Sequence, residues 1–250
     1  MEYDGTNYYG FQLQANRPTI QGEIEQAWYK LTRESVRAMS ASRTDTGVHA
    51  ERQAVSINTN SSLPMQTIVD GLNHYLPFDI AAKDAYKVAD TFNVRRDAVS
   101  REYNYYILNS QTRSPIKRSF ACNVTGELDI GAMNQACRYL IGEHDFTSFT
   151  ILAEAKTRST VRRVFKAEVR NQEGLVVFNI VANSYLRHQV RNIAGTLIRV
   201  GLGKMTIDEF HNIVEAERPG LAGPRAPACG LCLMQIKYPT PFGEDIAGDN

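Results

Sequence analysis

Apolar residues recur at helical spacing in four segments, 20–31, 64–72, 130–141 and 186–200. Thr19 precedes the first segment and is a good N-cap residue, and Pro64 is suited to opening the second. The last stripe, from Leu186 to Val200, would carry Arg187 and Arg191 one turn apart on a different face. The pattern therefore predicts four amphipathic helices.

Other segments alternate apolar and polar residues, as strands with one buried face do. They are 53–59, 102–107 and 161–170, and two further strands are predicted at the apolar run 175–182 and at 231–236. In 161–170 the apolar set is Val161, Phe165, Ala167 and Val169, and a turn at 171–174 predicts a hairpin with the following strand. Strands and helices alternating around an explicit hairpin predict an α+β protein with antiparallel sheet.

The least regular stretch, near 90–100, divides the chain. The expected organisation is an α+β half at 1–96, a second α+β half at 97–239 and a polar tail at 240–250.

Composition fits an ordinary globular protein, with 43% hydrophobic and 22% charged residues. No apolar run approaches the roughly 20 residues that span a bilayer, and the N-terminus does not resemble a secretory signal. Four cysteines do not make a disulfide scaffold. We therefore expect a reduced, cytoplasmic protein with no membrane partner.

The formal net charge is only +1, but the basic residues are clustered. Six lie between Lys156 and Arg170, and two smaller clusters are Arg187, His188 and Arg191, and Arg95, Arg96 and Arg101. Such clustering suits one electropositive face for a polyanion. Charge alone equally allows ordinary solvated faces.

The segment Ala41–Ala50 contains the strongest candidate chemistry. Asp45 stands among small and hydroxylated residues before Gly47, and Arg43 is placed to hold its carboxylate ionised. An ionised carboxylate can act as a covalent nucleophile, whereas an Asp in a turn often serves only as a cap. Asp45-Thr46-Gly47 also matches the triplet of aspartic proteases, but those need two such carboxylates, so this chain would have to act as a dimer.

Two other features have ordinary interpretations. Cys229 and Cys232 form a C-x-x-C that enters a predicted strand and lacks the second pair of a zinc site, so neither a metal nor a redox role is favoured. Tyr103 and Tyr105 on one strand face would by themselves be core aromatics.

Several motifs follow one another from residue 2 to about 238: Glu2–Thr6, Tyr9–Gln12, Arg43–His49, Arg101–Tyr105, Gly142–Phe149, Asn183–Ile193 and Gly230–Leu233. In this order they resemble the TruA family of tRNA pseudouridine synthases. The sequence departs from the family at Phe11, where Trp is usual.

The resemblance implies two ferredoxin-like halves with joined antiparallel sheets and an active site in a basic cleft. It implies isomerisation of uridine to pseudouridine at positions 38, 39 and 40 of the tRNA anticodon stem-loop, by a homodimer without cofactor or metal.

By position, the resemblance assigns the nucleophile to Asp45, its partner to Arg43 and the base-stacking residue to Tyr103. It assigns a basic residue near the nucleophile to Arg191 and an apolar pocket residue to Leu231, within a substrate-binding set that also includes Arg187 and His188. Attack at C1′, attack at C6 and a glycal route all fit the sequence. The alternatives from other classes are a catalytically idle RNA-binding protein and the dimeric aspartic protease.

Overall fold

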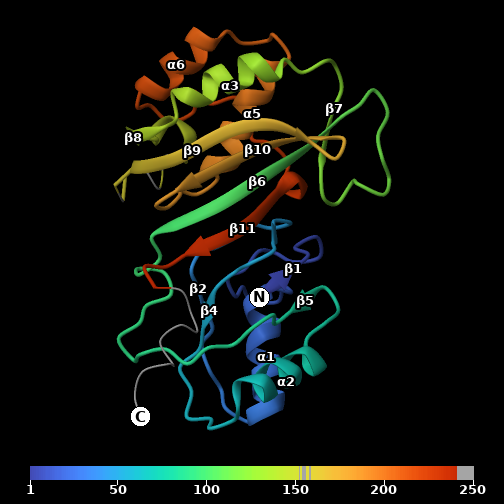
Figure 1. The fold of residues 1–250 in the computed structure, drawn as a ribbon, viewed down its shortest axis with the longest axis vertical. Coiled ribbons are helices and arrows are strands. Elements are labelled where there is room, and N and C mark those ends of the chain that lie inside the picture. Colours follow the sequence, from blue (N-terminus) through green and yellow to red (C-terminus); the bar gives the residue numbers. More distant parts are fainter. Residues whose placement is uncertain (152, 154–155, 158, 241–250) are drawn as a thin grey trace. The chain divides into compact units, whose positions relative to one another are not determined.

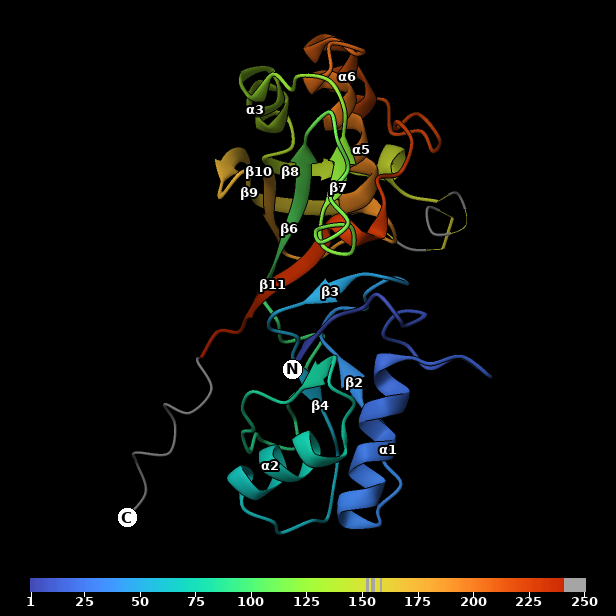
Figure 2. The ribbon, with the colours of Figure 1, turned by 90° about the vertical axis from the view of Figure 1, so that its right-hand side faces the viewer.

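The computed structural model describes residues 1–151, 153, 156–157 and 159–240. Most of the predicted tail, 241–250, lies outside the described residues. The chain forms two compact units (Figures 1 and 2): Met1–Arg101 together with the segment from Leu233, and Glu102–Cys232. Within the described residues, no helix has both the length and the apolar character that crossing a bilayer requires.

The division between the units falls after Arg101, close to the expected boundary at 96. The last strand, however, ends in the first unit instead of the second. Glu51 N donates to Leu233 O at 2.8 Å, and Val99 N donates to Lys237 O at 2.8 Å. These backbone bonds join distant parts of the chain, which a sequence-order division does not anticipate.

In the first unit, β1 (Glu2–Tyr3) pairs antiparallel with β3 (His49–Ala50) and with β5 (Ile80–Ala81). The strands β2 (Met39–Ser40) and β4 (Val55–Ser56) form a separate antiparallel pair. β4 is shorter than the strand predicted at 53–59, and Val55 and Ile57 are only half-buried.

Two helices complete the first unit and lie side by side (Figures 1 and 2). α1 (Ile20–Thr32) begins where the Thr19 side chain accepts a hydrogen bond from Gly22 N, as predicted. α2 (Met65–Tyr75) follows Pro64 and buries the two expected residues, Ile68 and Leu72.

The second unit contains a mostly antiparallel sheet. Its strands are β6 (Ser100–Asn109), β7 (Cys122–Val124), β8 (Gly142–Asp145), β9 (Val161–Gln172) and β10 (Leu175–Ala182), in the order β6-β10-β9-β8 with β7 parallel to β6. β11 (Leu231–Lys237) starts here and ends in the first unit. The α+β fold class with mostly antiparallel strands is confirmed.

Three helices gather on one face of this sheet (Figure 1): α3 (Ile130–Arg138), α5 (Gln189–Gly201) and α6 (Ile207–Glu215). Two short 3-10 turns, η1 (Thr147–Phe149) and η2 (Ala228–Gly230), complete the described elements of this unit. Met133, Ile193 and Leu197 are fully buried, so the apolar stripes predicted for α3 and α5 pack as expected. The sequence analysis did not predict α6, which buries Phe210.

The predicted alternation in β9 is wrong at its start. Ala167 and Val169 are buried as predicted, but Phe165 is 49% exposed and Val164 is buried instead. The register explains the change, because Val181 pairs with Lys166 whereas the next residue, Ala182, pairs with Val164. Phe165 is therefore the extra residue of a β-bulge, which switches the faces of the residues before it.

Candidate active site

Asp45 lies in a loop whose backbone is held by the N-terminal segment. Phe11 N donates to Thr44 O at 3.0 Å, and Gly47 N donates to Tyr8 O at 3.2 Å. The loop also closes on itself, because Val48 N donates to Asp45 O at 3.1 Å. Bonds on both sides of Asp45 fix the direction in which its side chain leaves the backbone.

Gly10 makes this close approach possible. A Cβ at position 10 would lie 2.7 Å from Thr44 O and 3.1 Å from Asp45 C, and the φ of Gly10 is +89°. Gly5 is similar, since a Cβ there would lie 2.0 Å from Val48 O. The motif around residues 4–12 therefore forms a wall against which the Asp45 loop packs.

A buried histidine ties the other end of the loop to the same wall. Gly5 N donates to His49 Nδ1 at 3.1 Å, and His49 is buried. Asp4 Oδ1 lies 3.1 Å from the same nitrogen and also accepts bonds from the backbone N–H and the hydroxyl of Thr6. This arrangement orders the turn that carries Gly5.

A network of buried polar side chains holds the Asp45 loop in place. Tyr3 Oη and Thr44 Oγ1 are hydrogen-bonded at 2.8 Å, and Gln53 Nε2 donates to Tyr3 Oη at 3.1 Å and to Ser42 O at 2.7 Å. Tyr3, Thr44 and Gln53 are all buried. By contrast, Asp45 is half-buried and Arg43 is exposed, so the candidate nucleophile is accessible at the end of a rigid support.

The second unit carries the other candidates. Tyr103 on β6 is only 5% exposed, and its ring meets the Tyr185 ring edge-on with centroids 5.2 Å apart and an interplanar angle of 88°. The Tyr185 hydroxyl donates to Ile180 O at 3.0 Å, which fixes that ring. Tyr103 thus has an oriented aromatic neighbour.

The expected helical face of Arg187 and Arg191 is wrong. α5 begins at Gln189, and His188 before it has a left-handed backbone with φ 65°. Arg187 therefore belongs to the preceding loop, where its carbonyl accepts from Thr150 Oγ1 at 3.1 Å. Leu186 continues the apolar spacing of the helix in the sequence but lies before its first residue, where its amide donates to Gln189 Oε1 at 2.8 Å and its carbonyl accepts from Gln189 N at 3.2 Å.

Arg191 is held by the segment before η2. Its Nε donates to Ala226 O at 2.8 Å, and Ala226 N donates to Arg191 O at 3.1 Å. Nearby, the Tyr105 hydroxyl donates to Pro227 O at 2.9 Å. Leu231, the first residue of β11, is buried.

The C-x-x-C motif takes part in the same packing. Cys229 Sγ donates weakly to Ala121 O at 3.8 Å, and burial raises the pKa of the Cys229 thiol. Both Cys229 and Cys232 are free thiols. A raised pKa disfavours the thiolate, which is the reactive form of Cys229.

The predicted residues therefore form two groups. Arg43 and Asp45 belong to the first unit, and the second unit holds the rest: Tyr103, Arg187, His188, Arg191 and Leu231. The sequence did not single out Gln53 or Tyr185 as supporting residues. Tyr185 had a usable signal, since it stands inside the motif Asn183–Ile193, whereas Gln53 had none.

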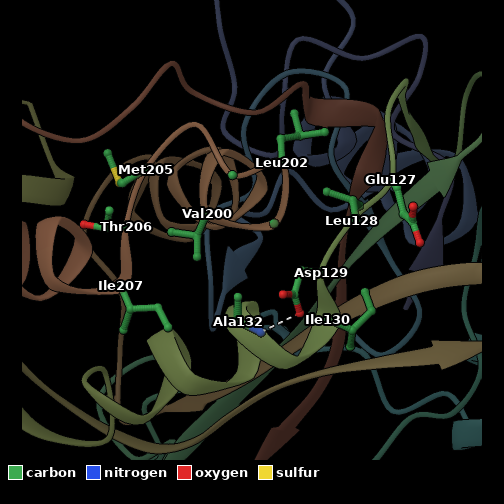
Figure 3. A pocket seen from close by; sticks show the side chains of 12 residues that line it. Glu127, Leu128, Asp129, Ile130, Ala132, Val200, Leu202, Met205, Thr206 and Ile207 are labelled. Atoms are coloured by element: carbon green, nitrogen blue, oxygen red, sulfur yellow. Dashed lines mark hydrogen bonds between the residues drawn. The ribbon is translucent and has the colours of Figure 1, made fainter.

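A separate surface pocket of about 840 Å³ lies where α3 and α6 begin and α5 ends (Figure 3). It is lined by apolar residues such as Leu128 and Met205 and by the acidic side chains of Glu127 and Asp129, with no basic residue. The Asp129 carboxylate already caps α3 by accepting from Ala132 N at 2.8 Å. This lining does not suit a polyanion, and the pocket contains no predicted site residue.

Within the part of the chain that the structure describes, no group of three or more His, Cys, Asp or Glu side chains is placed to hold a metal ion.

Comparison with known proteins relates most of the chain to one family. The family model described as tRNA pseudouridine synthase matches residues 1–97 and 136–239. tRNA pseudouridine synthase A of Pelobacter propionicus is 40% identical over 95% of this chain and 97% of its own length. The protein of the same name from Francisella tularensis is 39% identical over 96% of this chain and 92% of its own length.

Among solved structures, a chain from a Cbf5-Nop10-Gar1 complex covers 72% of this chain and 41% of its own length. Its sequence identity is 18% and its TM-score 0.35, which is too low for an argument about fold. The match to the family model and the similarity to relatives over nearly their whole length show the family. The chain belongs to the tRNA pseudouridine synthase family.

Proposed function

We propose that this protein isomerises uridine to pseudouridine in the anticodon stem-loop of tRNA, at positions 38, 39 and 40, with Asp45 as the nucleophile. The observation that carries the proposal is the Asp45 loop. In a chain of this family, an accessible carboxylate stands on a backbone braced by Phe11 and Tyr8.

The reaction breaks the bond from uracil N1 to ribose C1′, turns the base over and joins C5 to C1′. A base stacked within a stem cannot turn, so the nucleotide must first leave the stack, at a cost of a few kcal/mol. The Asp45 carboxylate then either stabilises the positive charge that develops at C1′ or forms a covalent bond to the nucleotide, and that bond must break again before the product is released. Once the new bond has formed, C5 loses its proton and N1 gains one, so the atoms balance.

Each remaining candidate has a chemical role in this scheme. Tyr103 stacks on the flipped uracil, a contact that its edge-on neighbour Tyr185 would steady. Leu231 supplies an apolar wall. Arg43 and Arg191 offer positive charge to the carboxylate, and Arg187 and His188 bind phosphates.

Substrate and product contain the same atoms at the same oxidation level, so the reaction itself calls for no redox cofactor or group donor. We extend the proposal to an enzyme that works without cofactor or metal, as a cytoplasmic homodimer. Its mass by light scattering, alone and with tRNA, tests the dimer.

The deciding experiment is tritium release from tRNA labelled with 5-³H-uridine. The wild type should release tritium, and Asp45→Asn should release none while retaining tRNA binding, because the amide is nearly isosteric but carries no charge. Asp70→Asn, at an exposed position on α2, is the matched control and should behave as the wild type. Turnover by Asp45→Asn would remove Asp45 from the mechanism, and tRNA binding without release by the wild type would favour an idle RNA-binding protein.

A further inference from the structure

The loop between β6 and β7, residues 110–121, is a basic turn that no proposed step uses. It includes Arg113, Lys117 and Arg118, all exposed, and the sequence has no acidic residue from 103 to 126. In Figure 1 it leaves the end of β6 near the label β7. It also lies outside both segments that match the family model, so family membership alone assigns it no role.

The loop is ordered by its own hydrogen bonds. Lys117 N donates to Ser114 Oγ at 3.2 Å, and the amides of Phe120 and Ala121 donate to Lys117 O at 3.0 and 2.9 Å. At its base, Asn123 Nδ2 donates to Ser110 O at 3.2 Å. These bonds fix the backbone of the turn that carries Arg113, Lys117 and Arg118.

Ile116, at the tip, is 90% exposed. Leaving so large an aliphatic side chain in water forgoes the gain from burial, at about 25 cal/mol per Å². Positive charge beside an exposed apolar side chain is the combination that contacts nucleic acid, where cations meet phosphates and apolar groups meet bases or sugars. A protein partner would have to supply carboxylates to match the three cations.

The base of the loop is connected to the candidate site within the second unit. Ala121 O accepts from Cys229 Sγ at 3.8 Å, and three residues earlier Ala226 O accepts from Arg191 Nε at 2.8 Å. The short segment 226–229 thus contacts both the loop and Arg191. A nucleic acid that reaches Arg191 would therefore lie close to the base of the loop.

We infer that loop 110–121 is an RNA-contacting element that binds tRNA outside the reacting nucleotide, with Lys117 and Arg118 on phosphates and Ile116 against a base or sugar. The inference rests on the proposed function, which supplies tRNA as the ligand. It adds a binding surface that the catalytic residues do not provide.

The test compares Lys117→Gln/Arg118→Gln with the charge-matched control Arg138→Gln/Lys204→Gln, whose residues are exposed on α3 and after α5. The loop variant should bind tRNA roughly tenfold more weakly at ~0.1 M salt, and the slope of log affinity against log salt should fall by about 1.5. The control should bind as the wild type. At saturating tRNA the loop variant should keep the wild-type rate of tritium release.

Ile116→Ser separates the apolar contact from the charges, and should weaken binding with the salt slope unchanged. Equal binding by the wild type and the loop variant, or equal losses in loop and control variants, would overturn the inference. So would a smaller assembly for Ile116→Ser by light scattering with RNA binding intact, since the tip would then be a protein interface. Failure of the proposed function looks different, because the wild type itself would release no tritium.

Discussion

Gly10 and Thr44 approach so closely that no side chain fits between them. A Cβ on Gly10 would lie 2.7 Å from Thr44 O and 3.1 Å from Asp45 C. Phe11, next in the chain, donates its amide to the same Thr44 carbonyl at 3.0 Å. The missing side chain at position 10 therefore sets where the backbone of Asp45 lies.

Gly10→Ala should lower both the free energy of unfolding and the turnover rate, and the loss of turnover should be the larger effect. The positive φ of Gly10 makes Ala cost about 1–3 kcal/mol of unfolding free energy. The clash also displaces Asp45, and a shift near 1 Å can cost about 100-fold in rate. Urea unfolding and tritium release measure the two effects.

Gly174→Ala is the matched control, since its φ is also positive, +76°, with nothing within 4 Å of the added Cβ. It should show comparable destabilisation with normal turnover. Equal losses of activity in the two variants would mean that the approach of Gly10 to Thr44 has no special role.

The four predicted helices are present, although α6 was not predicted and α5 begins later than expected, whereas the face of Phe165 on β9 was assigned wrongly. Thr19 and Pro64 preceded their helices as predicted, because capping and proline geometry are local properties. The bulge at Phe165 depends on how β10 pairs with β9, and pairing across a hairpin is not encoded in the alternation of one strand. Phe165 was therefore assigned to the wrong face.

In the candidate site, too, some residues could be predicted from the sequence and others could not. Asp45 and Tyr103 could be named from motifs, because their residue types stand within recognisable segments. The contacts of Gly10 and Gln53 with the Asp45 loop join residues 34 and 11 positions apart, from Thr44 to Gly10 and from Gln53 to Ser42. Tertiary folding creates these contacts, and no local sequence pattern predicts them.

His49→Ala should destabilise the loop and slow the reaction without weakening tRNA binding. The change leaves the buried Gly5 amide without its acceptor, which costs about 1–3 kcal/mol. We expect kcat to fall while the dissociation constant for tRNA stays constant. His74→Ala, at an exposed position of α2, should change stability by less than about 0.5 kcal/mol. Weaker tRNA binding by His49→Ala with an unchanged kcat would contradict a positioning role.

Tyr103→Phe should retain substrate binding and lose turnover. The phenylalanine ring keeps the edge-on contact with Tyr185, so stacking survives, but it lacks the hydroxyl, which could relay the C5 proton by giving up its own to another acceptor. General-base catalysis typically contributes about 10²–10⁴-fold, which sets the expected loss in single-turnover rate. Tyr185→Phe is the control, because its hydroxyl bonds the Ile180 carbonyl, and it should lose far less. Full activity in Tyr103→Phe would show that the hydroxyl is dispensable.

Asp145→Asn should reduce stability in a way that depends on pH. The Asp145 carboxylate accepts from Thr147 N at 2.8 Å, Thr147 Oγ1 at 2.6 Å and Thr160 Oγ1 at 2.9 Å. Burial acts to raise the pKa of Asp145, but these hydrogen bonds outweigh it and hold the pKa below its ordinary value of 3.8.

A lowered pKa in the folded state means that the ionised form stabilises the protein above the unfolded pKa, near 3.8, and that this contribution disappears as the pH falls through the folded pKa. The difference in unfolding free energy between wild type and Asp145→Asn should therefore be constant from about pH 7 to 5 and shrink below about pH 4. Thr160→Val removes one of the three bonds and should give a smaller difference with the same pH dependence. Urea titrations at several pH values measure both, and a difference that grows towards acid would reverse the sign assigned to Asp145.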